Sequence, residues 1–290
     1  MRQEDVLFGE GTVRLAGTLV LPVAQGQPPA VVFVHGSGSV TRDLYQVVAL
    51  HFARHGIAAL IYDKRGCGGS TGDWRESSYD DLADDVLAGV QLLTERPDIN
   101  PHGIGLWGHS QGGWIVPIAA ARSPAVAFVI PVSGAGITPT QQEVYHQSNL
   151  LRDQGASERT VARSRLLITS ISALLRVVPI AALPRRGGWQ HMAHAVRFKP
   201  LRVWEQVTQP TLALWGDLDR VVPPEQSAAL IGAALRHAGN HDYITHIVAH
   251  ANHRLGSGDA DPLATQDVEQ FAPAILNVMI DWILERFSPC

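Results

Sequence analysis

The chain has 290 residues, of which 46% are hydrophobic and 17% are charged, and its formal net charge is −4. This length and composition are typical of one large globular core with an insertion. The negative charge argues against nucleic-acid-binding proteins, which need a basic surface. We therefore expect a globular protein with no nucleic-acid partner.

The beginning of the chain does not have the pattern of a secretory signal. Residues 1–5 are polar, and the apolar stretch at residues 15–23 is short, contains glycine and proline, and is typical of a strand. The two cysteines, Cys67 and Cys290, do not have the spacing of a metal site or a disulfide framework. We expect a cytoplasmic protein without a membrane span.

Strand and helix patterns alternate along the chain. After a hairpin over residues 6–20, buried strands are predicted at 30–34, 57–62, 103–107, 126–132, 211–215 and 243–249, and helices at 45–54, 79–96, 113–121 and 266–286. This alternation predicts an α/β fold with a doubly wound, mostly parallel sheet and an antiparallel start.

The alternation breaks between residues 134 and 200, where a helical, arginine-bearing segment is inserted. We interpret this segment as a helical cap. The predicted organisation is therefore a core of residues 1–133, a cap of residues 134–200, and a second part of the core from 201 to 290.

The most informative motif is GHSQG at residues 108–112, which stands between a strand and a helix. A serine at so sharp a turn is forced towards positive φ, and a Cβ at Gly108 or Gly112 would crowd the strand or the helix. The turn exposes the Ser110 hydroxyl, and the next amide, at Gln111, lies at a helix N-terminus where partial positive charge accumulates. We predict that Ser110 is a nucleophile and that the Gln111 amide is one oxyanion donor.

Two segments, YDKRGCGGS at residues 62–70 and GHSQGGW at 108–114, resemble the α/β-hydrolase superfamily. Within it they look like the bacterial esterase and serine-aminopeptidase-like branch. The resemblance covers nearly the whole chain, except roughly residues 134–200, where only the placement of an insertion is similar. It implies an α/β-hydrolase fold, a serine hydrolase that needs no cofactor, and a triad in the chain order serine, acid, histidine.

A glycine-rich loop, HGSGS at residues 35–39, follows the buried strand at 30–34. Such a loop lets the backbone approach a reacting carbonyl, although the same glycines could simply connect a strand to a helix. By resemblance, the amide of Ser37 joins that of Gln111 in the oxyanion hole. Gly38 is the alternative donor, because a sequence does not reveal where an amide points.

Two carboxylates follow the strand at 211–215 and compete for the role of the acid. Asp217 comes at once after the strand, whereas Asp219 lies in the turn before a Val-Val-Pro segment, which is the family pattern. We favour Asp219 as the triad acid and interpret Asp217 as a turn or helix-capping residue.

The base must follow the acid and lie on a loop, which leaves two of the 13 histidines, His250 and His253. His253 stands in a segment, ANHRL, that matches the family's histidine loop. His250 continues the alternation of the strand at 243–249, so it is interpreted as a sheet residue. We predict that His253 is the base.

The cap contains a long apolar run at residues 166–183. Arg176 and Pro179 interrupt this run, so a membrane span is not expected. One interpretation is a helix that packs on the core or contacts a second copy in a homodimer, and the other is a wall over Ser110 that supplies an apolar acyl pocket. The cap carries nine basic and three acidic side chains, a net charge of +6.

Three classes of function follow from these motifs. The first is a carboxylesterase that cleaves small to medium esters, with a thioesterase as a close variant. The second is a serine aminopeptidase, for which a cationic cap is a poor receptor of a substrate ammonium group. The third is a binding protein without activity, which the set of Ser110, Asp219 and His253 disfavours. The expected partner is a small-molecule ester, and neither a metal nor another cofactor is expected.

Overall fold

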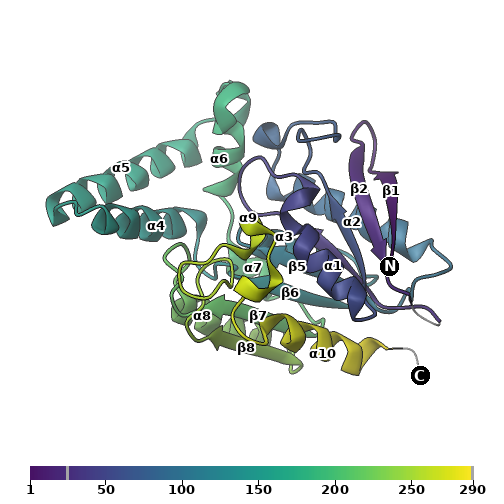
Figure 1. The fold of residues 1–290 in the computed structure, drawn as a ribbon. Helices are drawn as coiled ribbons and strands as arrows, with labels where there is room; N and C mark the ends of the chain where they lie inside the picture. The colour runs from purple at the N-terminus through teal and green to yellow at the C-terminus, as the bar shows by residue number, and fades with distance from the viewer. Residues whose placement is uncertain (24–25, 289–290) are drawn as a thin grey trace.

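An eight-stranded sheet runs through the protein, with helices on both of its faces (Figure 1). The computed structural model describes residues 1–23 and 26–288. The strands are β1 (Arg2–Phe8), β2 (Leu15–Leu21), β3 (Ala30–Val34), β4 (Ala58–Tyr62), β5 (Ile104–His109), β6 (Phe128–Val132), β7 (Thr211–Gly216) and β8 (Tyr243–Val248). Their order across the sheet is β1-β2-β4-β3-β5-β6-β7-β8.

The sheet is parallel except at its beginning. β1 pairs with β2, and β2 with β4, in antiparallel fashion, whereas β4, β3, β5, β6, β7 and β8 form parallel pairs in that order. Every residue of β3, β4, β5, β6 and β7 is buried, as expected for parallel strands covered on both faces. The predicted fold class is confirmed.

The sheet divides the core into two apolar layers, and helices cover each of them. Helices α2 (Tyr79–Thr94), α3 (Gly112–Arg122) and α8 (Pro224–His237) contribute to one layer. Helices α1 (Gln46–Arg54) and α10 (Ile275–Phe287) contribute to the other. The nucleophile turn between β5 and α3 is therefore fixed by a central strand and by a helix that is itself buried.

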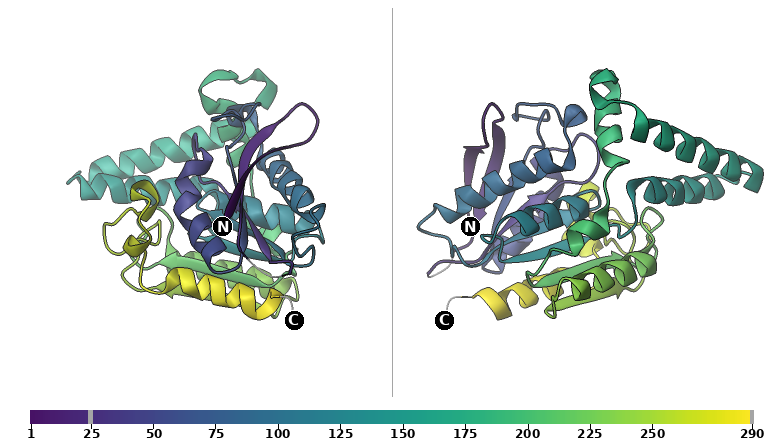
Figure 2. Two further views of the ribbon diagram at one scale, coloured as in Figure 1. Left: turned by 45° about the vertical axis from the view of Figure 1, so that its right-hand side comes forward. Right: turned by 180° about the vertical axis from the view of Figure 1, so that it is seen from behind.

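The insertion between β6 and β7 contains α4 (Pro139–Asp153), α5 (Glu158–Val177), α6 (Trp189–Ala195) and α7 (Pro200–Trp204). Helix α4 begins with Pro139 behind a capping box of Thr138 and Gln141, the pattern that favours helix starts. Helices α4 and α5 lie side by side and extend away from the sheet, whereas α6 lies beside the core (Figures 1 and 2).

The prediction of one helix over residues 266–286 is confirmed from residue 275 on and is wrong before it. The chain forms a short helix, α9 (Pro262–Thr265), then a 3-10 turn, and α10 begins only at Ile275. Pro273 explains the late start, because proline lacks a backbone N–H and disfavours the helical conformation of the residue before it. The segment before α10 therefore remains available to form part of a loop wall near the site.

The prediction that residues 243–249 form a buried strand is also partly wrong. β8 is the last strand of the sheet, and Ile244, Thr245 and His246 are exposed. The strand ends at Val248, and His250 lies beyond it as an exposed residue with φ of 57°. His250 is therefore a turn residue and does not continue the sheet.

No helix of the described residues is long and apolar enough to cross a membrane. Cys67 is buried and free, and Cys290 lies outside the described residues.

Candidate active site

The turn after β5 holds Ser110 with φ of 55°, a conformation that L-residues rarely adopt. Backbone atoms lie so close to the two flanking positions that only glycine fits there. A Cβ at Gly108 would lie 2.6 Å from the Gly112 carbonyl oxygen, and one at Gly112 would lie 2.5 Å from the carbonyl oxygen of Val34. The Ser110 amide donates to the Val132 carbonyl at 2.9 Å, so the neighbouring strand also holds the turn.

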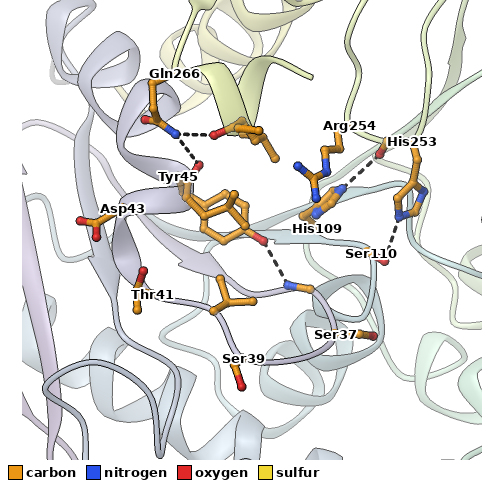
Figure 3. Close-up of a pocket in the computed structure, with 15 residues that line it drawn as sticks. Ser37, Ser39, Thr41, Asp43, Tyr45, His109, Ser110, His253, Arg254 and Gln266 are labelled. Atoms are coloured by element: carbon orange, nitrogen blue, oxygen red, sulfur yellow. Dashed lines mark hydrogen bonds between the residues drawn. The ribbon is translucent and has the colours of Figure 1, made fainter. Parts of the chain in front are cut away.

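Three side chains from distant parts of the sequence meet at this turn. His253 Nδ1 lies 2.8 Å from Asp219 Oδ2, and His253 Nε2 lies 2.9 Å from Ser110 Oγ (the second contact is drawn in Figure 3). The carboxylate accepts from Nδ1, which leaves Nε2 free to accept the Ser110 hydroxyl proton. The structure thus brings together the three residues that were selected from motif and chain order.

Asp219 is the carboxylate that reaches His253. Its side chain is fully buried, and its other oxygen accepts 2.8 Å hydrogen bonds from the amides of Val221 and Val222. These bonds stabilise a buried carboxylate and fix its direction. Asp217 is exposed and instead accepts a 3.2 Å hydrogen bond from the Ala251 amide, so it braces the loop that carries His253.

The loop of His253 is held by its neighbour Asn252. The Asn252 side chain accepts from the amides of Arg254 and Gly256 at 2.9 and 3.1 Å and donates to the carbonyls of Gly258 and Ala260 at 2.9 and 2.7 Å. All polar atoms of this side chain are thereby used, and the histidine is presented from a defined turn.

His109, inside the nucleophile motif, was not singled out from the sequence. Its Nε2 donates to the His253 carbonyl at 3.1 Å, and the two rings lie 5.1 Å apart. Burial and the nearby His253 lower the pKa of His109 to about 3. His109 is therefore a neutral donor that holds the backbone of His253 in place.

The amides of Ser37 and Gln111 donate to no other group among the residues that the structure describes. Gln111 immediately precedes the buried helix α3. Tyr45 holds the start of the loop at residues 35–39, because its hydroxyl accepts a hydrogen bond from the Gly36 amide at 3.0 Å. Ser37 lines the same cavity as Ser110, whereas Gly38 has φ of 85° and is not among the residues that line it. Of the two candidate donors, Ser37 is therefore the one that lines the cavity together with Ser110.

A cavity of about 620 Å³ opens beside Ser110 (Figure 3). Its walls come from the loop and helix start at residues 36–45 and from the segment around His253 and α9. The lining side chains include several hydroxyl, amide and charged groups: Ser37, Ser39, Thr41, Asp43, Arg254 and Gln266. Arg254 is paired with Asp261 at 2.6 Å. The cavity is therefore mixed in polarity rather than apolar.

The cap run at residues 166–183 does not form the apolar wall that was considered as one interpretation. No residue of the cap lines the cavity beside Ser110. The run is divided, because α5 ends at Val177 before an extended segment at Pro179. Leu166 and Val177 are 68% and 77% exposed. The lining of this cavity therefore gives no support to the acyl-pocket interpretation of the run.

No cluster of three or more His, Cys, Asp or Glu side chains among the described residues has an arrangement that could hold a metal ion. His191, which has another histidine three residues later, instead bonds to the Ser77 carbonyl through Nδ1 at 2.7 Å and to Gln111 Nε2 through Nε2 at 3.1 Å. Both ring nitrogens are thus used within the protein.

Known proteins resemble this chain in sequence. A family model described as "Serine aminopeptidase, S33" matches residues 27–167, and one described as "Prolyl oligopeptidase family" matches residues 185–278. Thiohydrolase aneE of Aspergillus aculeatus is 35% identical over 41% of this chain and 37% of its own length. Esterase EstD of Thermotoga maritima is 29% identical over 49% of this chain and 35% of its own. The match thus spans well under half the length of these curated relatives.

The fold has close counterparts among solved structures. The α/β hydrolase GrgF from Penicillium sp. superposes with a TM-score of 0.68 over 100% of both chains, at 21% sequence identity. At this identity the likeness concerns the fold.

Proposed function

The chain belongs to the α/β-hydrolase superfamily, and on this premise we propose that it is a serine hydrolase that cleaves small to medium carboxylic esters. The observation that carries the proposal is the ring of His253, which lies within hydrogen-bonding distance of both Ser110 Oγ and Asp219 Oδ2. A nucleophile, a base and an orienting acid are the parts that acyl transfer needs.

In the proposed mechanism, His253 Nε2 takes the proton of Ser110 as Oγ attacks the ester carbonyl. Asp219 holds the imidazole tautomer and stabilises the imidazolium. The amides of Ser37 and Gln111 donate to the oxyanion. His253 then protonates the leaving alcohol, which departs and leaves an acyl-Ser110 ester. Water, deprotonated by His253, attacks this ester and releases the acid, and Ser110 recovers its proton.

A serine aminopeptidase is the second candidate, and one observation favours it besides the family name. Asp43 lines the cavity beside Ser110 and is a carboxylate that could hold a substrate ammonium group. The +6 charge of the cap does not decide against it, because no cap residue lines this cavity and exposed charges are screened within about 8–10 Å at ordinary salt.

A substrate panel separates these candidates. We expect kcat/KM for acetyl and butyryl p-nitrophenyl esters to exceed that for leucyl and prolyl p-nitroanilides by about 100-fold or more. An octanoyl ester and an acyl thioester in the same panel test chain length and the thioesterase variant. An unblocked aminoacyl anilide as the best substrate would replace the esterase proposal with the aminopeptidase one, and Asp43→Asn should then raise KM for anilides alone.

A further inference from the structure

The two lysines of the chain lie in opposite environments. Lys199, at the end of the cap, is exposed, whereas Lys64, two residues after β4, is 2% exposed. Taking an ammonium group out of water costs several kcal/mol unless other groups compensate. An apolar residue of similar length would avoid this cost, so the contacts of Lys64 require an explanation.

No carboxylate among the described residues pairs with Lys64. The two nearby acids have other partners, because Asp63 pairs with Arg42 at 3.1 Å and Asp85 pairs with Arg65 at 2.7 Å. Lys64 is therefore not half of a structural ion pair.

The Lys64 ammonium group instead contacts both sides of the proposed oxyanion hole. Nζ donates to the Gly36 carbonyl at 3.0 Å and to Gln111 Oε1 at 2.9 Å, and it lies 5.2 Å from the centre of the Trp74 ring. The backbone N–H of Lys64 donates to the Val40 carbonyl at 3.1 Å. Lys64 thus holds both ends of the loop that contains Ser37, at Gly36 and at Val40, and it also holds the side chain of Gln111, the residue after Ser110.

The bond to Gly36 bears directly on the Ser37 amide, because the two groups belong to one peptide unit. No described peptide bond is cis, and in a planar trans peptide the C=O and the N–H point in opposite directions. A cation on the Gly36 oxygen therefore directs the Ser37 N–H away from Lys64. It also polarises the peptide, which strengthens that N–H as a donor.

We propose that Lys64 is a positioning residue of the oxyanion hole, whose charge fixes the Gly36–Ser37 peptide and the Gln111 side chain and strengthens the donor at Ser37. This inference rests on the proposed serine-hydrolase function. The Lys64 ammonium group lies on the carbonyl side of this peptide, opposite to the Ser37 N–H, and does not touch the substrate.

The same cation directs a chain of hydrogen bonds into the cap. Gln111 Oε1 accepts from Lys64, so its Nε2 donates to His191 Nε2, and His191 Nδ1 in turn donates to the Ser77 carbonyl. Burial lowers the pKa of His191 to about 4, which keeps this ring neutral and able to accept. Helix α6 of the cap is thereby tied to the residue that follows the nucleophile.

Burial lowers the pKa of Lys64 to about 8, and the charges of Cys67 and Asp85 partly oppose this. The other titratable groups that its charge affects are His35 and His191, which burial keeps neutral with pKa values lowered to about 3 and 4. Lys64 should therefore lose its proton as the pH rises through about 8, and kcat should fall over that range.

Lys64→Met tests the proposal, with Lys199→Met as the matched control. Removing one oxyanion-hole donor costs about 10²–10³-fold in kcat, and a residue acting through that donor should cost about 10–100-fold, with KM changed less than about 3-fold. Affinity for a boronic acid that mimics the tetrahedral intermediate should fall in parallel. Lys199→Met should match the wild type.

The pH profile provides a readout that a purely structural role would not move. The fall in kcat above about pH 8 should be present in the wild type and in Lys199→Met, and absent from Lys64→Met. It should also be present in Cys67→Ser, a variant that removes the other ionisable group near Nζ. A folded Lys64→Met with wild-type kcat and pH profile would overturn the inference.

A measurement on the wild-type protein covers the case in which Lys64→Met does not fold. With lysine labelled by ¹⁵N, two side-chain signals are expected, and the signal that titrates near pH 8 should shift when the boronic acid binds. An unshifted signal contradicts the proposal. Failure of the proposed function itself is distinct, because the wild type would then hydrolyse no ester of the panel and a fluorophosphonate would not label Ser110.

Discussion

The turn around Ser110 and helix α5 of the cap are built under opposite constraints. At the turn, a Cβ on Gly112 would lie 2.5 Å from a backbone oxygen, so no other residue type fits without a shift of the strand. In α5, Leu166 and Val177 are 68% and 77% exposed, so these positions tolerate almost any residue type. Residue type therefore predicts structure and chemistry best where the neighbours of a residue are backbone.

The largest expected effect tests the chemistry of the turn. Ser110→Ala should lower turnover by at least about 10⁴-fold and abolish labelling by a fluorophosphonate, because the acyl-enzyme cannot form without Oγ. The measurement is ester hydrolysis with intact-protein mass spectrometry after labelling. A folded Ser110→Ala with near-wild-type hydrolysis would place the reaction elsewhere.

The next effect separates two acids that are two residues apart. Asp219→Asn should lower kcat by about 10³- to 10⁴-fold, because an amide can hold the wrong imidazole tautomer. Asp217→Asn should leave kcat within a few-fold, since Asp217 is exposed and braces only the Ala251 amide. The reverse ranking, measured with one ester, would transfer the role of the acid to Asp217.

A pair of glycines compares the core with the cap directly. Gly112→Ala should lower the free energy of unfolding by about 3 kcal/mol, because its Cβ meets the Val34 carbonyl. Gly155→Ala in the cap should cost only about 1–2 kcal/mol, for its φ of 75°, since nothing lies within 4 Å of its Cβ position. Urea unfolding of both variants gives the comparison, and equal losses would remove the distinction between the two regions.

Lys64, which contacts the residue after Ser110, and Lys199, in the cap, compare the same two regions through the pH dependence of stability. Between about pH 8 and 10.5 the folded protein binds fewer protons at Lys64 than the unfolded chain does, so this residue makes stability rise with pH over that window. Below pH 8 its buried charge is a cost, and Lys64→Met should be more stable than the wild type at pH 7. That advantage should shrink at pH 9.5, whereas Lys199→Met should show none at either pH.

Much of the core could be predicted from the sequence. The strands at 30–34 and 211–215 were placed to within a residue of β3 and β7, because buried parallel strands are continuous apolar runs between turns. Ser110, Asp219 and His253 could be selected because a fixed chain order leaves few candidates.

Other features could not be predicted, for reasons that are physical. The sequence shows that Ile244 is apolar but not that β8 is the edge strand, since edge position depends on the order of the whole sheet. The apolar run from 166 to 183 does not reveal which face is covered. Lys64 lies in a motif, YDKRGCGGS, whose pattern gives no sign that its ammonium group reaches Gly36 and Gln111.

The smallest expected effect concerns two adjacent residues of α5. Leu174 is 59% exposed and Leu175 is 3% exposed, in a small cluster with Ala193 and Val196. Leu175→Ala should lower the free energy of unfolding by about 2 kcal/mol, whereas Leu174→Ala should change it by no more than about 0.5 kcal/mol. Neither variant should change kcat/KM for a short ester by more than about 2-fold, because no residue of α5 lines the cavity beside Ser110. Unfolding and ester kinetics at two protein concentrations provide the check. A concentration-dependent loss of stability in Leu174→Ala alone would mean that a second copy covers this face, as in a homodimer, and the exposed stripe of the cap would then be as constrained as the core.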